Sequence, residues 1–245
     1  MTSAGRRRFN GLAAYLKVLY APVQAFALLN QTPMWGWAAV AGTLLTMAGT
    51  ILLSPATLHN MHILQQQELG RLHGEMADQF RIAVSRIPDW AYVAAGSLVA
   101  VAVVWLLWFL GAVVLVIVAA LGHGRPTFLG AWVIVLNSYL IGGLSTIVNA
   151  AIILAKGLGD AKAPVDLYAI PSPAAFVHGS PKLALFLYGF NVFYLWYYVV
   201  VAIALEHVMK MRRAAAVTVV IFLALLGAAL ASVFARWRFE RHAQV

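Results

Sequence analysis

The chain has 245 residues, of which 63% are hydrophobic, 12% aromatic and only 10% charged. Soluble domains carry about 25% charged residues, so a water-soluble enzyme is excluded. The formal net charge is +9, but the basic residues stand mostly at the edges of apolar blocks, where anionic lipid headgroups attract them. No continuous basic face is present, and we therefore expect no nucleic-acid partner. The composition predicts an integral membrane protein.

Residues 1–32 form a basic N-terminal segment that begins with Arg6, Arg7 and Arg8. The stretch from Phe9 to Leu29 then mixes apolar residues with polar ones such as Asn10 and Lys17. This mixture predicts an interfacial helix lying on anionic lipid. A disordered basic tail is the alternative, because short isolated helices are marginally stable.

Five stretches are long and apolar enough to cross a bilayer. A hydrocarbon core about 30 Å thick requires roughly 20 residues of helix, since each backbone amide in lipid must be hydrogen-bonded within its own segment. We expect an all-α polytopic membrane protein whose five transmembrane helices are residues 33–53, 90–121, 127–155, 183–209 and 214–234. Residues 236–245 would form a C-terminal tail.

The longest polar segment follows the first predicted span. Its apolar residues recur at three- and four-residue spacing, which is typical of a helix. We therefore predict an extramembrane amphipathic helix over residues 56–88. Its apolar stripe needs a cover, which could be the membrane, another loop or a second copy of the chain.

Polar side chains within the third and fourth spans are the most informative residues for function. They are Asn137, Ser145, Thr146, Asn149 and Asn191. One interpretation is a polar track for a headgroup or an ion. The other is adhesion between helices, since such side chains commonly hydrogen-bond across membrane bundles.

Two charged residues stand near the inner end of the fourth span. Glu206 and Lys210 are four residues apart in the favourable order, which predicts an ion pair at the interface. A proton-coupled site would require Glu206 deeper in the membrane. His59 and His62 lack a third ligand, so we expect no metal site, and the aromatic residues of span four lack the ligand pattern of a cofactor pocket.

Several short motifs, in order, resemble the Yip family of Ypt/Rab-interacting membrane proteins. They are Pro22, Phe26 and Pro33-Met34-Trp35 before the first span, Gly122 to Ala131 before the third, Asn191-Val192-Phe193-Tyr194-Leu195-Trp196, and Met211-Arg212-Arg213-Ala214. The resemblance implies a five-helix Yip-like domain over residues 33–235, similar to the prokaryotic members. Eukaryotic members are associated with Rab GTPases and vesicle traffic, and no enzymatic activity follows from the family.

The sequence therefore predicts a non-enzymatic protein that acts in membrane organisation or in partner recruitment. The alternative is a lipid or small-solute transporter, or scramblase, that uses the polar residues of spans three and four. Expected partners are membrane lipids, including anionic headgroups, and a second copy or another membrane protein. Short basic loops around Arg125 and residues 209–213 place the N-terminus in the cytoplasm, and we expect a multi-pass protein of a bacterial inner membrane.

Overall fold

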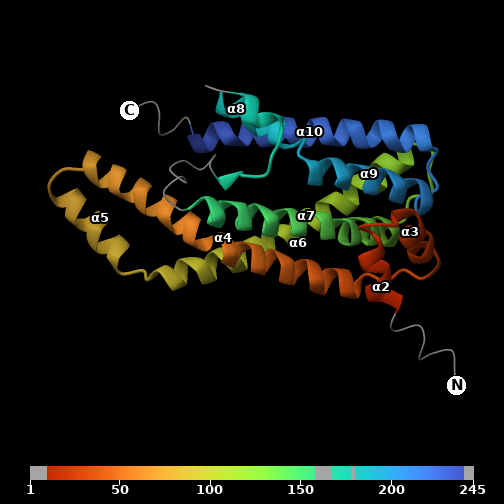
Figure 1. Cartoon of the computed structure of the whole chain (residues 1–245), viewed down its shortest axis with the longest axis horizontal. Coiled ribbons are helices and arrows are strands. Elements are labelled where there is room, and N and C mark those ends of the chain that lie inside the picture. The colour runs from red at the N-terminus through yellow and green to blue at the C-terminus, as the bar shows by residue number, and fades with distance from the viewer. Residues whose placement is uncertain (1–9, 158–166, 178–179, 240–245) are drawn as a thin grey trace, which may run out of the picture.

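The computed structural model describes residues 10–157, 167–177 and 180–239, and every regular element in these ranges is a helix (Figure 1). This confirms the prediction of an all-α polytopic membrane protein. Arg6, Arg7 and Arg8 and residues 240–245 lie outside the described residues. The elements are α2 (Asn10–Lys17), α3 (Pro22–Gln31), α4 (Gly36–Arg71), α5 (Glu75–Ser85), α6 (Asp89–Leu121), α7 (Phe128–Lys156), the 3₁₀ helix η3 (Pro173–Phe176), α8 (Pro181–Tyr188), α9 (Val192–His207) and α10 (Arg213–Phe239).

Four helices, α4, α6, α7 and α10, are each long and apolar enough to cross a membrane. The backbone amide of Arg125 donates to the carbonyl of Met209 at 2.7 Å, so the turn before α7 and the loop before α10 lie at the same end of the bundle. Since α7 leads the chain away from that end, α8 and α9 must return it. In Figure 1, α2 and the far end of α10 accordingly lie at opposite ends.

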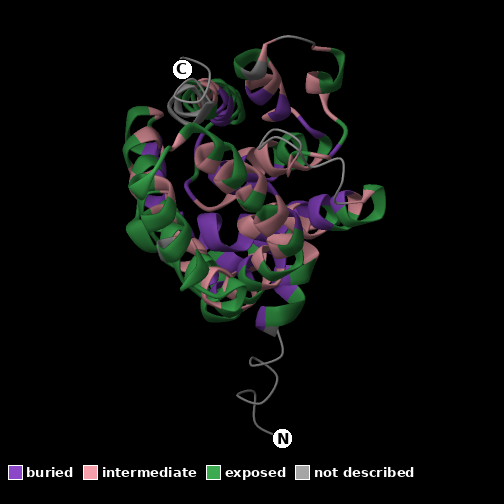
Figure 2. Cartoon of the chain, turned by 90° about the vertical axis from the view of Figure 1, so that its left-hand side faces the viewer, coloured by how far each residue is buried: buried purple, intermediate pink, exposed green. Residues whose placement is uncertain are grey.

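The outer surface of the bundle is apolar, as a lipid solvent requires. Leu107 on α6 is 58% exposed and Phe222 on α10 is 62% exposed. Buried segments lie inside the bundle and exposed ones outside (Figure 2). In water such a surface would be an aggregation hazard, whereas in a bilayer it meets hydrocarbon.

The fourth predicted span is broken, which corrects the single helix expected over residues 183–209. α8 ends at Tyr188, α9 begins at Val192, and the two helices meet at an angle of 50°. The last span differs as well, because α10 runs to Phe239. The first residues of the predicted C-terminal tail are therefore helical.

The amphipathic helix expected over residues 56–88 is two helices. α4 continues through Pro55 to Arg71, and its 36 residues span about 54 Å at 1.5 Å per residue, well beyond the hydrocarbon core. The chain then turns at Gly74, which has φ +62°, and returns through α5. The result is a projecting hairpin, residues 56–88, whose base is joined by His62 Nε2 and Asp89 Oδ1 at 3.3 Å.

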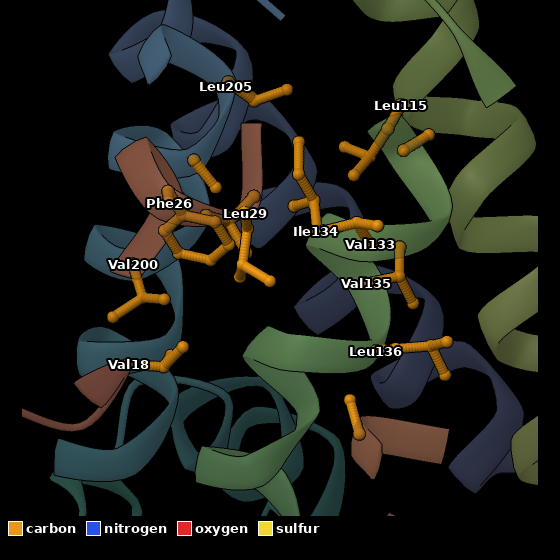
Figure 3. Packing of buried hydrophobic residues seen from close by; sticks show 14 of the residues in the cluster. Val18, Phe26, Leu29, Leu115, Val133, Ile134, Val135, Leu136, Val200 and Leu205 are labelled. Atoms are coloured by element: carbon orange, nitrogen blue, oxygen red, sulfur yellow. The ribbon is translucent and has the colours of Figure 1, made fainter. Parts of the chain in front are cut away.

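Residues 10–31 of the N-terminal segment form two helices packed on the bundle, and this corrects the single interfacial helix. Pro22 lacks a backbone N–H and stands in the first turn of α3, where that loss is harmless. Phe26 and Leu29 of α3 are almost completely buried and lie near Val200 and Leu205 of α9 (Figure 3). These residues of α3 are therefore part of the core.

α4 and α7 approach each other closely because glycines lie between them. A Cβ atom placed on Gly143 would lie 2.9 Å from Leu45 Cβ, and one on Gly49 would lie 2.6 Å from Thr146 Cγ2. Small residues are a usual device for packing membrane helices, since lipid supplies no hydrophobic force between them. This contact makes α4 and α7 the tightly packed side of the bundle.

Candidate functional site

The predicted polar residues of α7 do not form one track. The Asn137 amide nitrogen donates to Val133 O at 2.9 Å in its own helix and to Met34 O at 3.4 Å in the segment before α4. Ser145 is buried, and the Thr146 hydroxyl donates to Gly142 O at 3.2 Å. Asn137 therefore connects α7 to the start of the first span, and Thr146 is bonded within its helix.

Asn149 anchors the loop that precedes α8. Its amide nitrogen donates to Leu167 O at 2.7 Å, and its Oδ1 accepts from the amides of Ala169 at 2.7 Å and Ile170 at 3.3 Å. The Tyr188 hydroxyl also lies 3.4 Å from this oxygen. Asn149 is buried, and these partners engage both ends of its amide.

Asn191 is the N-cap of α9. Its Oδ1 accepts from the amides of Phe193 at 3.0 Å and Tyr194 at 3.1 Å, and its Nδ2 donates to Tyr188 O at 3.1 Å. An asparagine in this position satisfies amides that the first turn of a helix leaves unpaired. The three asparagines of the predicted track thus bond to nearby backbone groups and hold local structure together.

The expected ion pair between Glu206 and Lys210 is not formed. α9 ends at His207, and Lys210 has φ +54° in the connection to α10, so the two residues no longer share a helix face. Among the described residues, the ion pairs within 4 Å are His62–Asp89, Arg71–Glu68 and Arg81–Asp78. Because α9 ends before Lys210, Glu206 can bind a partner other than Lys210.

A groove of about 500 Å³ lies between α9 and α10. Sequence reasoning missed it, although its walls follow helical spacing. We call it the α9–α10 groove; its walls are Leu195, Val199 and Ile203 on α9 and Val217, Ile221 and Leu225 on α10. Five of these six side chains are exposed on the outside of the bundle, and Ile203 is partly buried.

The two ends of the α9–α10 groove differ chemically. One end reaches Phe190 at the break before α9, and the other carries Glu206 and Arg213. From Val192, the first residue of α9, to Glu206 the helix rises by fourteen residue steps, which corresponds to about 21 Å. One leaflet of the hydrocarbon core is about 15 Å thick, so the groove is longer than the depth of one leaflet.

A second hollow of about 470 Å³ lies among α6, α7, α9 and α10, and it opens to the outside between exposed residues such as Leu107. Its polar lining comes from Trp108, Tyr139, Thr146 and the tyrosines of α9, namely Tyr194, Tyr197 and Tyr198. The Tyr139 hydroxyl lies 2.9 Å from Thr46 Oγ1, and the buried Trp108 indole N–H has no acceptor within the described residues. Tyr198 and Val220 line both hollows.

Comparisons of the chain with protein-family models, with curated proteins and with solved structures find no match. Within the described ranges, no three His, Asp or Glu side chains are grouped so that they could hold a metal ion. The α9–α10 groove, with its charged end, is therefore the site whose geometry and chemistry are most distinctive.

Proposed function

We propose that this chain is a non-enzymatic, multi-pass membrane protein that organises its bilayer by holding a lipid molecule between α9 and α10. The observation that carries the proposal is the α9–α10 groove, which is apolar along its walls and charged at one end. A membrane lipid has the same division, with an apolar chain and a charged or polar headgroup.

The energetics of such a site differ from those of a pocket in water. A lipid chain already lies in hydrocarbon, so its transfer into the groove gains packing contacts and little hydrophobic free energy. Residence of the lipid then depends on the headgroup contacts at Glu206 and Arg213. This arrangement suits selection of a lipid by its headgroup more than storage of any apolar molecule.

Transport along the polar residues of spans three and four has less support. The side chains of Asn137, Asn149 and Asn191 are engaged in hydrogen bonds to backbone groups, and a solute would have to displace these bonds. A bound lipid in the α9–α10 groove requires no such displacement. The geometry thus favours lipid binding over a conduit through the bundle.

Lipid binding is tested by placing a large side chain in the groove from its exposed wall. Val217 lines the groove and is 43% exposed, so Val217→Trp places the indole in the groove without invading the core. Val103→Trp on α6 is the matched control, because Val103 is 47% exposed and does not line the groove. We expect native mass spectrometry to find about one retained phospholipid per chain in the wild type and in Val103→Trp, but not in Val217→Trp. Equal lipid retention in all three proteins would refute the proposal.

Partner recruitment through the projecting hairpin is a second candidate. The apolar side chains of Met76, Ile82 and Ile87 are exposed in the hairpin. The hairpin lies beyond the first span, so these side chains are not covered by the hydrocarbon around that span. A second copy of the chain or another membrane protein would bind this surface, and such binding agrees with partner recruitment of the Yip type. Because the chain has no cysteine, Met76→Cys gives a single thiol, and we expect a disulfide-linked dimer in membranes if a second copy covers the hairpin. Absence of any linked species would reject the dimer.

The same thiol tests the proposed orientation in a bacterial inner membrane. Basic residues in short segments gather at the end of the bundle that carries α2; they are Lys17, Arg125, Lys210, Arg212 and Arg213. Cytoplasmic segments carry such an excess. We expect a membrane-impermeant maleimide to label Met76→Cys in intact cells and to leave Tyr20→Cys, at an exposed position near α2, unlabelled. The reverse pattern would invert the orientation.

A further inference from the structure

The charged end of the α9–α10 groove contains two opposite charges that do not pair with each other. Glu206 and Arg213 both line this end, and neither forms an ion pair within 4 Å in the described part of the chain. They are the charged side chains among the residues that line this otherwise apolar groove. A ligand that matches only one of them would leave the other uncompensated.

Helix stability does not account for these charges. Glu206 lies in the last turn of α9, and Arg213 is the first residue of α10. The helix dipole disfavours a carboxylate at a C-terminus and a guanidinium at an N-terminus. Each charge thus stands at the helix end where it destabilises the helix. A partner outside both helices would offset that cost.

We infer that the α9–α10 groove selects a lipid of the phosphatidylethanolamine class, with the phosphate on Arg213 and the primary ammonium on Glu206. This inference rests on the proposed lipid-binding function and adds the headgroup to it. Guanidinium binds phosphate through charge-assisted hydrogen bonds, and an ammonium with three N–H donors binds a carboxylate in the same way. The headgroup carries both groups a short distance apart on one molecule.

Other common headgroups match only part of this pattern. Phosphatidylglycerol offers its phosphate to Arg213 but brings no cation to Glu206. Phosphatidylcholine carries a cation, but its quaternary nitrogen has no N–H and donates no hydrogen bond. The order of binding expected from charge and hydrogen bonding is therefore phosphatidylethanolamine first, with the other two lipids weaker.

The experiment measures headgroup preference by native mass spectrometry of the full-length protein with equimolar phosphatidylethanolamine, phosphatidylglycerol and phosphatidylcholine of identical chains. We expect a preference of about tenfold for phosphatidylethanolamine, since one hydrogen bond to a charged group is worth roughly that factor. Glu206→Gln should abolish the preference over phosphatidylglycerol, and Arg213→Gln should weaken the binding of all three lipids. Arg212→Gln is the matched control, because this neighbouring arginine does not line the groove, and it should keep the wild-type preference.

A second measurement needs no variant and therefore does not depend on how a substituted chain folds. Stepwise N-methylation of phosphatidylethanolamine removes one N–H donor at a time, and retention by the wild type should fall along the series. Lipid that is bound without headgroup preference, or with phosphatidylglycerol preferred, would overturn the inference while the lipid-binding function stands. No retained lipid of any kind would overturn both.

Discussion

Replacing Asn149 with leucine should release the loop before α8. The substitution removes the short bonds to Leu167 O and Ala169 N, both 2.7 Å, and the longer ones to Ile170 N and Tyr188 OH, at 3.3 and 3.4 Å. With about 1 kcal/mol for each short bond and less for each longer one, the loss is about 3 kcal/mol. Leucine has the same branched arrangement of side-chain heavy atoms as asparagine but no polar atom, so the backbone groups of the loop lose their partner.

Hydrogen exchange and thermal unfolding in detergent micelles test this reasoning together. In Asn149→Leu, peptides covering residues 167–170 should exchange faster, because the amides of Ala169 and Ile170 lose their acceptor. Thr146→Val is the control, since in the described part of the chain the Thr146 hydroxyl bonds within α7, and it should leave both readouts close to the wild type. Unchanged exchange over residues 167–170 in Asn149→Leu would refute the role of Asn149 as the anchor of this loop.

Two further predictions concern helix packing and capping. Gly143→Ala should destabilise the bundle by about 1–3 kcal/mol, because the new methyl meets Leu45 at 2.9 Å; Gly142→Ala, whose methyl would meet Tyr139 at an ordinary 3.6 Å, is the control, and equal stability of the two variants would contradict the close approach. Asn191→Ala should cost about 1 kcal/mol by removing the N-cap of α9, whereas Asn191→Ser should retain most of it. Unfolding midpoints in detergent measure both effects, and a stable Asn191→Ala would contradict the capping role.

The positions of the spans could be predicted because lipid imposes a length and a composition on any helix that crosses it. The ends of the helices could not be predicted in this way, because a helix can continue beyond the hydrocarbon core. α4 continues past the membrane to Arg71, through Pro55, whose missing N–H does not end the helix. Hydropathy therefore predicts where a helix leaves the hydrocarbon, whereas capping residues and turns determine where the helix ends.

The break before α9 has a signal in the sequence, although Asn191 also belongs to a motif that resembles the Yip family. An asparagine followed by an apolar run is an N-cap signal, and Asn191 after Gly189 fits it. Within an otherwise apolar stretch, composition alone cannot separate a capped helix start from a polar residue in mid-helix. The same limit applies to Asn149, because its partners lie 18 to 21 residues later in the chain, and only the tertiary fold brings them within reach.

The break also sets where the α9–α10 groove ends. α4 and α7 meet through glycines, whereas α9 has 16 residues, about 24 Å of helix, and α8 departs from its axis by 50°. The groove runs between α9 and α10 from Phe190, at the break, to Glu206. Because the Asn191 cap fixes the first turn of α9, it also fixes the end of the groove that lies opposite the charges.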